Sequence, residues 1–392
     1  MNRFLALLAA ACMAVAARAD TYVVLPFFNA SHTANLDWIG ESISEGIRGA
    51  LSYHGLMTLS RDDRQEAFRR LGLRADANLT RATVMKIGQA LDANQVVYGE
   101  FEFQPPPPGD KSRGSLKIVA HVLDLRALRQ GPEFSEIASL DDLAAEQARI
   151  AWETLRYLTP KGAPSEEEFR RQRTQIRVDA MESYIRGLLA TNADQKYRLF
   201  SQAVRLEPGY SEASFELGML AYSREDYRAA ADWFEKVSPA MPRHRKALFY
   251  LGICRFESGA YAAAETAFRT VAETVPLNEV WNNLGAAQSR LNRAQATDNF
   301  VKALEGDSSD PVYHFNVGYS LWRQKQFDSA AERFRAVLDR TPEDSVAAAL
   351  LAKCRGHQGP QPNDPERLER LKTQYEESAY WQLKAVLQPD KQ

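Results

Sequence analysis

One residue spacing limits what this chain can fold into more than any other feature. Glycine recurs at positions 218, 252, 285 and 318, at intervals of 34, 33 and 33 residues. A period of this length indicates stacked copies of one small unit, none of which can bury its apolar face alone. Two further columns keep the same interval, namely Ala230, Ala264, Ala296 and Ala330, and Phe234, Phe268, Phe300 and Phe334.

Each unit has the pattern of two antiparallel helices. In residues 211–244, Leu217 and Leu220 belong to one apolar stripe, and Ala230 and Phe234 belong to a second stripe at helical spacing. Small residues in the glycine and alanine columns allow two helix backbones to approach, the large phenylalanine fills the space between units, and a late proline ends the second helix. The sequence therefore predicts an all-α solenoid.

This pattern resembles the tetratricopeptide repeat. Most signature positions are filled in one unit by Leu251, Gly252, Gly259, Tyr261, Ala264, Phe268 and Pro276, and the next unit adds Trp281, Leu284 and Gly285. The resemblance implies a solenoid over 178–360, with a degenerate repeat at 178–210, full repeats at 211–244, 245–277, 278–310 and 311–344, and a half repeat at 345–358.

The C-terminal residues 361–392 are expected to form a capping helix and a tail. Asp364 can cap a helix that begins at Pro365. Leu368, Leu371, Tyr375 and Leu383 would then share one side of that helix. Such a helix would cover the last apolar face of the solenoid.

Residues 20–158 contain no repeat and predict a small α/β sandwich with a mixed sheet, which makes the whole chain α+β. Strands are expected at 22–27, 56–59, 95–103 and 115–125, and helices at 36–51, 62–71 and 80–91. Ser139, with Asp142 three residues later, is expected to open a last helix that ends at Leu158. Residues 159–177 are interpreted as a linker of limited order.

The same region resembles the TolB amino-terminal domain-like family. The resemblance rests on VVLPFFNAS, LDWIGESISEGIRGALSYH, LMTLSR, ANQVVYGEFEF and LKIVAHVLDL. It implies association with the bacterial envelope and contacts with other proteins, and it supplies no catalytic residue.

The first nineteen residues are interpreted as an export signal. Arg3 precedes an apolar run over 4–17, and Ala17-Arg18-Ala19 is a small-x-small cleavage site. The mature chain would be periplasmic or secreted, and no later stretch approaches the roughly 20 apolar residues that a membrane span needs. The alternative is a lipid anchor on Cys12.

Composition and motifs argue against several classes of function. With 49 basic and 51 acidic residues, the net charge of −2 gives no general attraction to nucleic acid. The six histidines form no ligand-spaced pair, and HExxH, CxxC, GxxxxGK[ST], GxSxG and GxGxxG are absent. No catalytic residue, metal or cofactor is predicted. Cys254 and Cys354 hold equivalent repeat positions and should be buried and unpaired.

What remains is a binding surface for a protein or peptide. In a tetratricopeptide solenoid the first helix of each repeat lines the concave face, and its aromatic side chains can anchor a peptide while asparagines bond the peptide backbone. Whether these aromatics are exposed or packed between helices stays open. The predicted groove residues are Phe215, Met219, Tyr222, Phe249, Ile253, Phe256, Asn282, Asn283, Phe315, Asn316, Tyr319 and Trp322.

The expected ligand is an apolar or extended peptide more than a charged tail. Asn283 and Asn316 hold equivalent positions, and Arg290 and Arg323 follow each of them by seven residues. This resembles part of a clamp for a terminal carboxylate. Because the earlier repeats offer Glu212, Glu216 and Lys246 instead, the cationic pocket is incomplete.

The leading hypothesis is an exported, non-enzymatic scaffold that holds a protein segment in its groove while the N-terminal domain docks an envelope component. An alternative is an accessory or regulatory subunit of an envelope machine for secretion, lipoprotein handling or signalling. A minor alternative is an unrecognised hydrolase.

Overall fold

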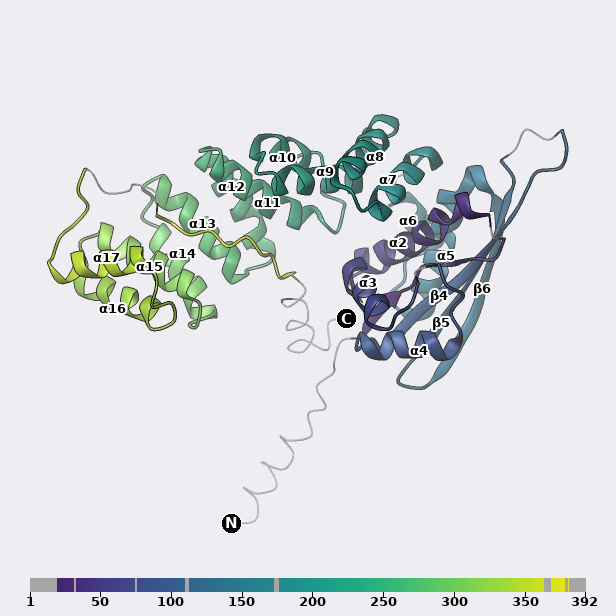
Figure 1. Cartoon of the computed structure of the whole chain (residues 1–392), viewed down its shortest axis with the longest axis horizontal. Coiled ribbons are helices and arrows are strands. Elements are labelled where there is room, and N and C mark those ends of the chain that lie inside the picture. The colour runs from purple at the N-terminus through teal and green to yellow at the C-terminus, as the bar shows by residue number, and fades with distance from the viewer. Residues whose placement is uncertain are drawn as a thin grey trace, which may run out of the picture. The chain divides into compact units, whose positions relative to one another are not determined.

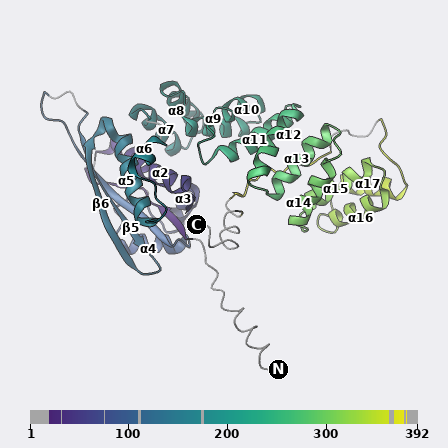
Figure 2. The ribbon, with the colours of Figure 1, turned by 180° about the vertical axis from the view of Figure 1, so that it is seen from behind.

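The structure, a computed structural model, describes residues 20–31, 33–74, 76–109, 113–172, 176–362, 368–377 and 380. Its described residues divide into two compact units, one up to Tyr210 and one from Ser211 to Tyr380 (Figures 1 and 2). The predicted signal at 1–19, Cys12, and the expected cap positions Asp364, Pro365 and Leu383 lie outside the described residues.

The first unit contains the predicted mixed sheet. Its strand order is β3-β1-β4-β5-β6, and β2 pairs separately with β4. β1 runs parallel to β3 and β4, whereas β4, β5 and β6 are antiparallel, with Gln95 opposite Asp124. The strands are β1 (Thr21–Val24), β2 (Phe28–Asn29), β3 (Met57–Thr58), β4 (Gln95–Gln104), β5 (Ser115–Asp124) and β6 (Arg129–Ser139).

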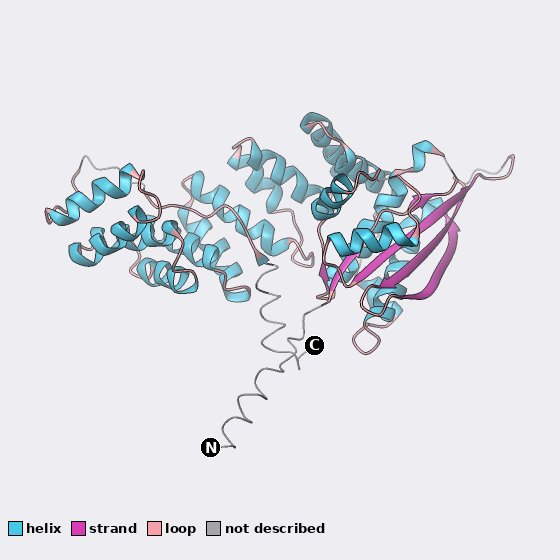
Figure 3. Cartoon of the chain, turned by 60° about the horizontal axis from the view of Figure 1, so that its bottom comes forward, coloured by secondary structure: helices cyan, strands magenta, loops and turns pink. Residues whose placement is uncertain are grey.

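Alternating apolar residues in β4 and β5 form the core of this unit. Val96 and Leu123 face each other across the two strands and pack with Phe68 and Ile87 of the helices α3 and α4. The neighbouring residues in each strand point to the opposite face of the sheet. The helices of this part are α2 (Trp38–Tyr53), α3 (Arg61–Arg70), α4 (Arg81–Ala90) and α5 (Leu143–Leu158), with short 3-10 helices at Ala34–Leu36 and Leu140–Asp142. Figure 3 shows the sheet and these helices by type.

The edge strand β6 was not predicted, and the last helix begins later than expected. Gly131 and Pro132 interrupt the pattern of β6, and Ile137 is 68% exposed, so little apolar alternation marks the strand. Its order comes instead from pairing with β5. Ser139 caps the short 3-10 helix, and α5 starts only at Leu143.

The segment expected to be a linker of limited order is in part folded onto the first unit. Helix α6 (Glu166–Arg171) starts with a capping box between Ser165 and Glu168. Phe169 is buried and its ring stacks on His54, while the indole of Trp152 donates to the Pro164 carbonyl at 3.0 Å. The expectation of limited order is wrong for residues 159–172, because a single apolar residue in a charged run anchors the segment.

Among the described residues, eleven helices follow as five pairs and the single helix α17, as the four full repeats, the degenerate repeat and the half repeat predicted. The first pair belongs to the first unit, where α7 packs against α2, and the remaining helices belong to the second unit. They are α7 (Val178–Leu189), α8 (Ala193–Leu206), α9 (Ser211–Ser223), α10 (Tyr227–Phe234), α11 (His244–Glu257), α12 (Tyr261–Thr274), α13 (Asn278–Arg290), α14 (Ala296–Gly306), α15 (Pro311–Arg323), α16 (Phe327–Leu338) and α17 (Ser345–Arg355).

The glycine and phenylalanine columns meet in one contact. A Cβ atom added to Gly252 would lie 2.6 Å from the ring of Phe268, and the same holds for Gly218 and Phe234. The Phe234 ring also stacks on Tyr250 of the next repeat, with 5.9 Å between ring centroids. The two columns therefore keep their spacing because each phenylalanine ring lies where a side chain on the paired glycine would be.

The predicted capping helix is not formed over residues 368–376, although residues 377 and 380 are helical. Side chains far away in the sequence hold their backbone in another conformation, as the functional site shows.

Replacing Gly40 with alanine is expected to destabilise the first unit by about 1–3 kcal/mol, because overpacking forces a backbone shift. A Cβ atom there would lie 2.0 Å from the Phe27 carbonyl oxygen, where α2 meets the chain that follows β1. Gly49 on the same helix has no atom within 4 Å of its added Cβ, so Gly49→Ala should be neutral or stabilise by up to about 1 kcal/mol. Denaturant unfolding of both variants measures the difference, and equal effects would contradict the packing argument.

The two described cysteines are free and buried, as predicted. Burial raises the pKa of Cys254 to about 12 and that of Cys354 to about 11. Because the thiolate is the reactive form, neither thiol should react with iodoacetamide in the folded protein at pH 9, whereas both react in guanidinium. Mass spectrometry after alkylation tests this, and rapid labelling of the folded chain at pH 9 would show that a helix opens locally.

Candidate functional site

Residues 368–377, here called the C-terminal segment, run extended along the first helices of three repeats. Arg370 meets α15, Lys372 meets α13 and Glu377 meets α11. The segment therefore runs opposite to the order of the repeats, and it is the yellow trace beside α13 in Figure 1. The groove predicted from the sequence is filled by the chain itself.

Three asparagines hold the backbone of this segment. Asn316 accepts from the Arg370 amide at 2.9 Å and donates to the Arg370 carbonyl at 2.7 Å. Asn283 does the same for Lys372, at 2.8 Å in both directions. Asn282 donates to the Arg370 carbonyl at 2.8 Å and accepts from Asn316 at 2.7 Å. Because these bonds reach only backbone atoms, they fix an extended conformation and a register rather than a particular side chain.

A buried carboxylate site lies next to these asparagines. The Glu369 side chain is fully buried; it accepts from the Ser289 hydroxyl at 2.6 Å and pairs with Arg290 at 2.9 Å. The Arg323 guanidinium lies 3.7 Å away and also donates to Ser289. Arg290 is itself nearly buried and lies 5.4 Å from the centre of the Phe256 ring. The site thus gives a fully buried carboxylate two cations and a hydroxyl, and of the two cations Arg323 is 34% exposed.

Two cations of the segment meet carboxylates of the solenoid. Arg370 pairs with Asp344 through two bonds of 2.6 and 3.0 Å, and its guanidinium carbon lies 3.4 Å from the centre of the Phe315 ring. The Lys372 ammonium lies 2.6 Å from Asp310. The hydrogen bond from Arg370 lowers the pKa of Asp344. The charged side chains of the segment therefore face solenoid side chains of opposite charge.

An aromatic side chain of the segment is anchored on α11. Tyr375 is buried, and its ring centroid lies 5.0 Å from that of Phe249. Burial also raises the pKa of the Tyr375 hydroxyl. Leu371 packs against the same apolar cluster, and Arg245 binds Glu377 at 2.5 Å.

The structure brings part of the predicted groove set together around the segment and leaves the rest in helix packing. Phe249, Asn282, Asn283, Phe315 and Asn316 contact the segment, and Phe256 supports Arg290. The aromatic lining is buried rather than exposed. The other predicted residues pack within the solenoid. Phe215 contacts Phe234, Tyr222 contacts Tyr250, and Met219 and Ile253 lie in or against the apolar core. Tyr319 stacks on Phe315, and the Trp322 indole donates to the Gln358 carbonyl at 2.8 Å.

Sequence reasoning missed the segment and its charged contacts. The segment is extended, as expected of a groove ligand, but five of its ten residues are charged. The signal was present in the equivalent positions of Arg290 and Arg323. It was discounted because the first repeats lack matching cations, yet the carboxylate site needs only two neighbouring repeats.

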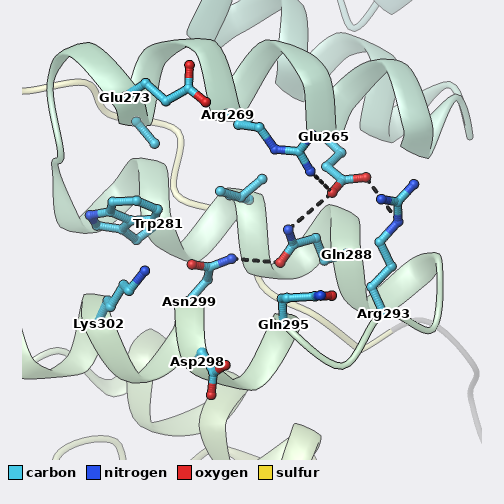
Figure 4. A pocket seen from close by; sticks show the side chains of 12 residues that line it. Glu265, Arg269, Glu273, Trp281, Gln288, Arg293, Gln295, Asp298, Asn299 and Lys302 are labelled. Atoms are coloured by element: carbon cyan, nitrogen blue, oxygen red, sulfur yellow. Dashed lines mark hydrogen bonds and ion pairs between the residues drawn. The ribbon is translucent and has the colours of Figure 1, made fainter.

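A cavity of about 370 Å³ lies among α12, α13 and α14 (Figure 4). Buried Glu265 pairs with Arg269 and with Arg293, and accepts from Gln288 at 3.1 Å. Gln288 in turn accepts from Asn299 at 2.7 Å. The network satisfies its own polar groups and joins two repeats, which is a structural role.

Among the described residues, no helix combines the length and apolar character that crossing a membrane requires. No cluster of three or more histidine, cysteine or acidic side chains in the described part of the chain is arranged to hold a metal ion.

Comparison with known proteins identifies the repeats. Residues 198–240, 236–279, 282–345 and 315–359 match the tetratricopeptide repeat family. Over 223 residues, 54% of this chain, the sequence is 29% identical to human and to mouse tetratricopeptide repeat protein 7B, and covers 26% of each. The chain thus spans about a quarter of the length of these curated relatives.

Several solved structures are also similar. YrrB, a TPR protein with an unusual peptide-binding site, aligns with a TM-score of 0.40 and 18% identity over 44% of this chain and 91% of its own. MamA from Desulfovibrio magneticus RS-1 aligns with a TM-score of 0.38 and 21% identity, over 42% and 95%. Pseudomonas aeruginosa pilF aligns with a TM-score of 0.38 and 17% identity, over 54% and 93%. With the family match and the curated relatives, the 33- to 34-residue period is accounted for: residues 198–279 and 282–359 carry tetratricopeptide repeats.

Proposed function

We propose that this protein is an exported, non-enzymatic scaffold that binds an extended segment of a partner protein in the groove of its second unit. The observation that carries the proposal is the set of asparagine bonds to the backbone of the C-terminal segment. Asn316 and Asn283 each bind both the backbone amide and the backbone carbonyl of one segment residue. The two residues that they bind, Arg370 and Lys372, are two positions apart in the segment. This arrangement is suited to an extended chain whatever its side chains.

Export and envelope docking are separate parts of the proposal. The basic start, apolar run and Ala17-Arg18-Ala19 support cleavage after Ala19, with a lipid anchor on Cys12 as the alternative. The resemblance of the first unit to the TolB amino-terminal domain-like family supports a role in docking an envelope component.

A second candidate is an accessory or regulatory subunit of one envelope machine. The C-terminal segment that occupies the groove favours this second candidate. A partner must displace the segment, and partners that bind weakly would not do so. One stoichiometric complex on purification would favour this candidate, and many partners would favour the general scaffold.

The test is crosslinking of the full chain in its native envelope, with identification of the captured proteins. Asn283→Ala with Asn316→Ala should abolish capture of a groove partner, while Asn78→Ala, a change at an exposed position of the first unit, should not. Circular dichroism must show that all variants are folded. Capture that survives loss of both asparagines would contradict the groove assignment.

N-terminal sequencing of the purified chain tests export on its own. The proposal expects Asp20 as the first residue. An intact Met1 on a chain that stays in the cytoplasm would remove the export proposal and leave the groove proposal standing.

A further inference from the structure

We propose, on the basis of the function proposed above, that the partner is an extended protein segment with a carboxylate side chain, an apolar residue two positions later and an aromatic residue six positions later, and that the C-terminal segment competes with it for the groove. Glu369, Leu371 and Tyr375 occupy those three positions in the chain itself.

The asparagines determine the direction and register of such a ligand. Asn316 and Asn283 come from successive repeats and bind residues two apart, which places the side chains of one face at fixed points along the groove. A ligand that enters in this register puts the residue before the Asn316-bound one into the carboxylate site. The repeat spacing therefore specifies where the acidic residue must be.

The carboxylate site supplies selectivity. Ser289, Arg290 and Arg323 converge on a side chain that is fully buried, and Arg290 is only 8% exposed. A neutral or basic side chain there would take the Glu369 carboxylate away from the nearly buried Arg290 guanidinium, which is unfavourable. Sites of this kind reject a ligand that lacks the required group more strongly than they reject one of different size.

The aromatic position adds affinity at the other end. Tyr375 is buried against Phe249, and Leu371 packs against the same apolar cluster. Buried aromatic anchors contribute much of the binding energy of a peptide interface.

The C-terminal segment is tethered close to the groove. Only residues 356–367 separate it from the end of α17, and a tether of this length gives an effective concentration of about 1 mM. If the free segment binds with a Kd near 10 μM, the tether keeps the groove about 99% filled and weakens a partner about 100-fold. A partner with the same three features and stronger contacts would displace it.

The experiment measures binding of a fluorescent synthetic peptide with the sequence of residues 366–380 to the full chain by anisotropy. One protein is the wild-type chain, and the other carries Glu369→Ala and Tyr375→Ala, which disable the internal segment. The peptide should bind the second protein at least tenfold more tightly. A peptide with Glu369→Gln should bind that protein at least tenfold more weakly than the unchanged peptide, while a peptide with Thr373→Ala, an exposed position, should bind equally well.

When Arg290→Met is added to the disabled chain, the unchanged peptide and the Glu369→Gln peptide should bind with equal affinity. If Arg290 had only a structural role, its loss would weaken both peptides and leave the preference for glutamate in place. Should the disabled chain fail to fold, a protease site introduced between residues 360 and 366 allows the segment to be cut and exchanged for the labelled peptide.

Three results would overturn the inference. Equal affinity for wild-type and disabled chains would show that the segment does not compete. A folded, opened chain that ignores the peptide would show that the groove accepts only its own tethered segment. A dimer in light scattering that exchanges segments between copies would make the segment an assembly device. If partner capture in the envelope still depends on Asn283 and Asn316 in any of these cases, the proposed function stands and only the peptide class is wrong.

Discussion

Arg290→Met releases the C-terminal segment from the groove. The change leaves the buried carboxylate of Glu369 with the Ser289 hydroxyl and the more distant Arg323. Removing one partner of a buried ion pair costs about 3–5 kcal/mol. The fraction of molecules whose C-terminal segment has left the groove should therefore rise at least about a hundredfold, up to complete release of the segment. The rest of the solenoid keeps its fold, because the segment is bound at the surface of helices that pack on each other.

Limited proteolysis measures this release directly. Trypsin cuts after Arg370 and Lys372 only when their backbone leaves Asn316 and Asn283, so cleavage at these two bonds should accelerate by the same factor. Arg69→Met is the matched control, because Arg69 makes an ion pair with Glu66 that is exposed and screened by solvent. Unchanged cleavage after Arg370 in a folded Arg290→Met chain would show that the carboxylate site does not hold the segment.

Phe268→Ala destabilises the second unit by about 3–5 kcal/mol. The Phe268 ring is fully buried, lies against Gly252 and meets Phe249 edge to face, with 6.0 Å between centroids. Its removal opens a cavity between the two helices of one repeat, in the apolar cluster that this repeat shares with its neighbours. Stability in a solenoid depends on the packing within and between such repeats. Because Phe249 also supports Tyr375, the variant should bind the C-terminal segment less firmly as well.

Denaturant unfolding followed by circular dichroism measures the loss for Phe268→Ala. Thr270→Ala, on the exposed side of the same helix, is the control and should change stability by less than about 0.5 kcal/mol. A loss below about 1 kcal/mol for Phe268→Ala would mean that the neighbouring repeats close the cavity.

The solenoid was predictable because its signals are local and repeated. Gly252 and Phe268 lie sixteen residues apart in one helical hairpin, and the same contact recurs in each unit, so the columns are visible without knowing the tertiary structure. The sheet was predictable where strands alternate, as in β4 and β5. It was not predictable at β6, where pairing with β5 orders a strand that has almost no apolar pattern.

The capping helix shows why local pattern is insufficient at the end of the chain. Leu368, Leu371 and Tyr375 have helical spacing, and nothing nearby in the sequence argues against a helix. Asn316 and Asn283, 54 and 89 residues away, instead satisfy the backbone groups that a helix would have used. A buried ion pair between Glu369 and Arg290 adds to the preference for the extended form.

The sequence by itself determined the repeat, its two-helix unit, the buried thiols and the asparagines placed to bind a backbone, because each depends on a spacing within one or two units. The tertiary structure alone decided what fills the groove. The bonds that hold the C-terminal segment join residues from 26 to 132 positions apart, and only the stacking of the repeats brings them together.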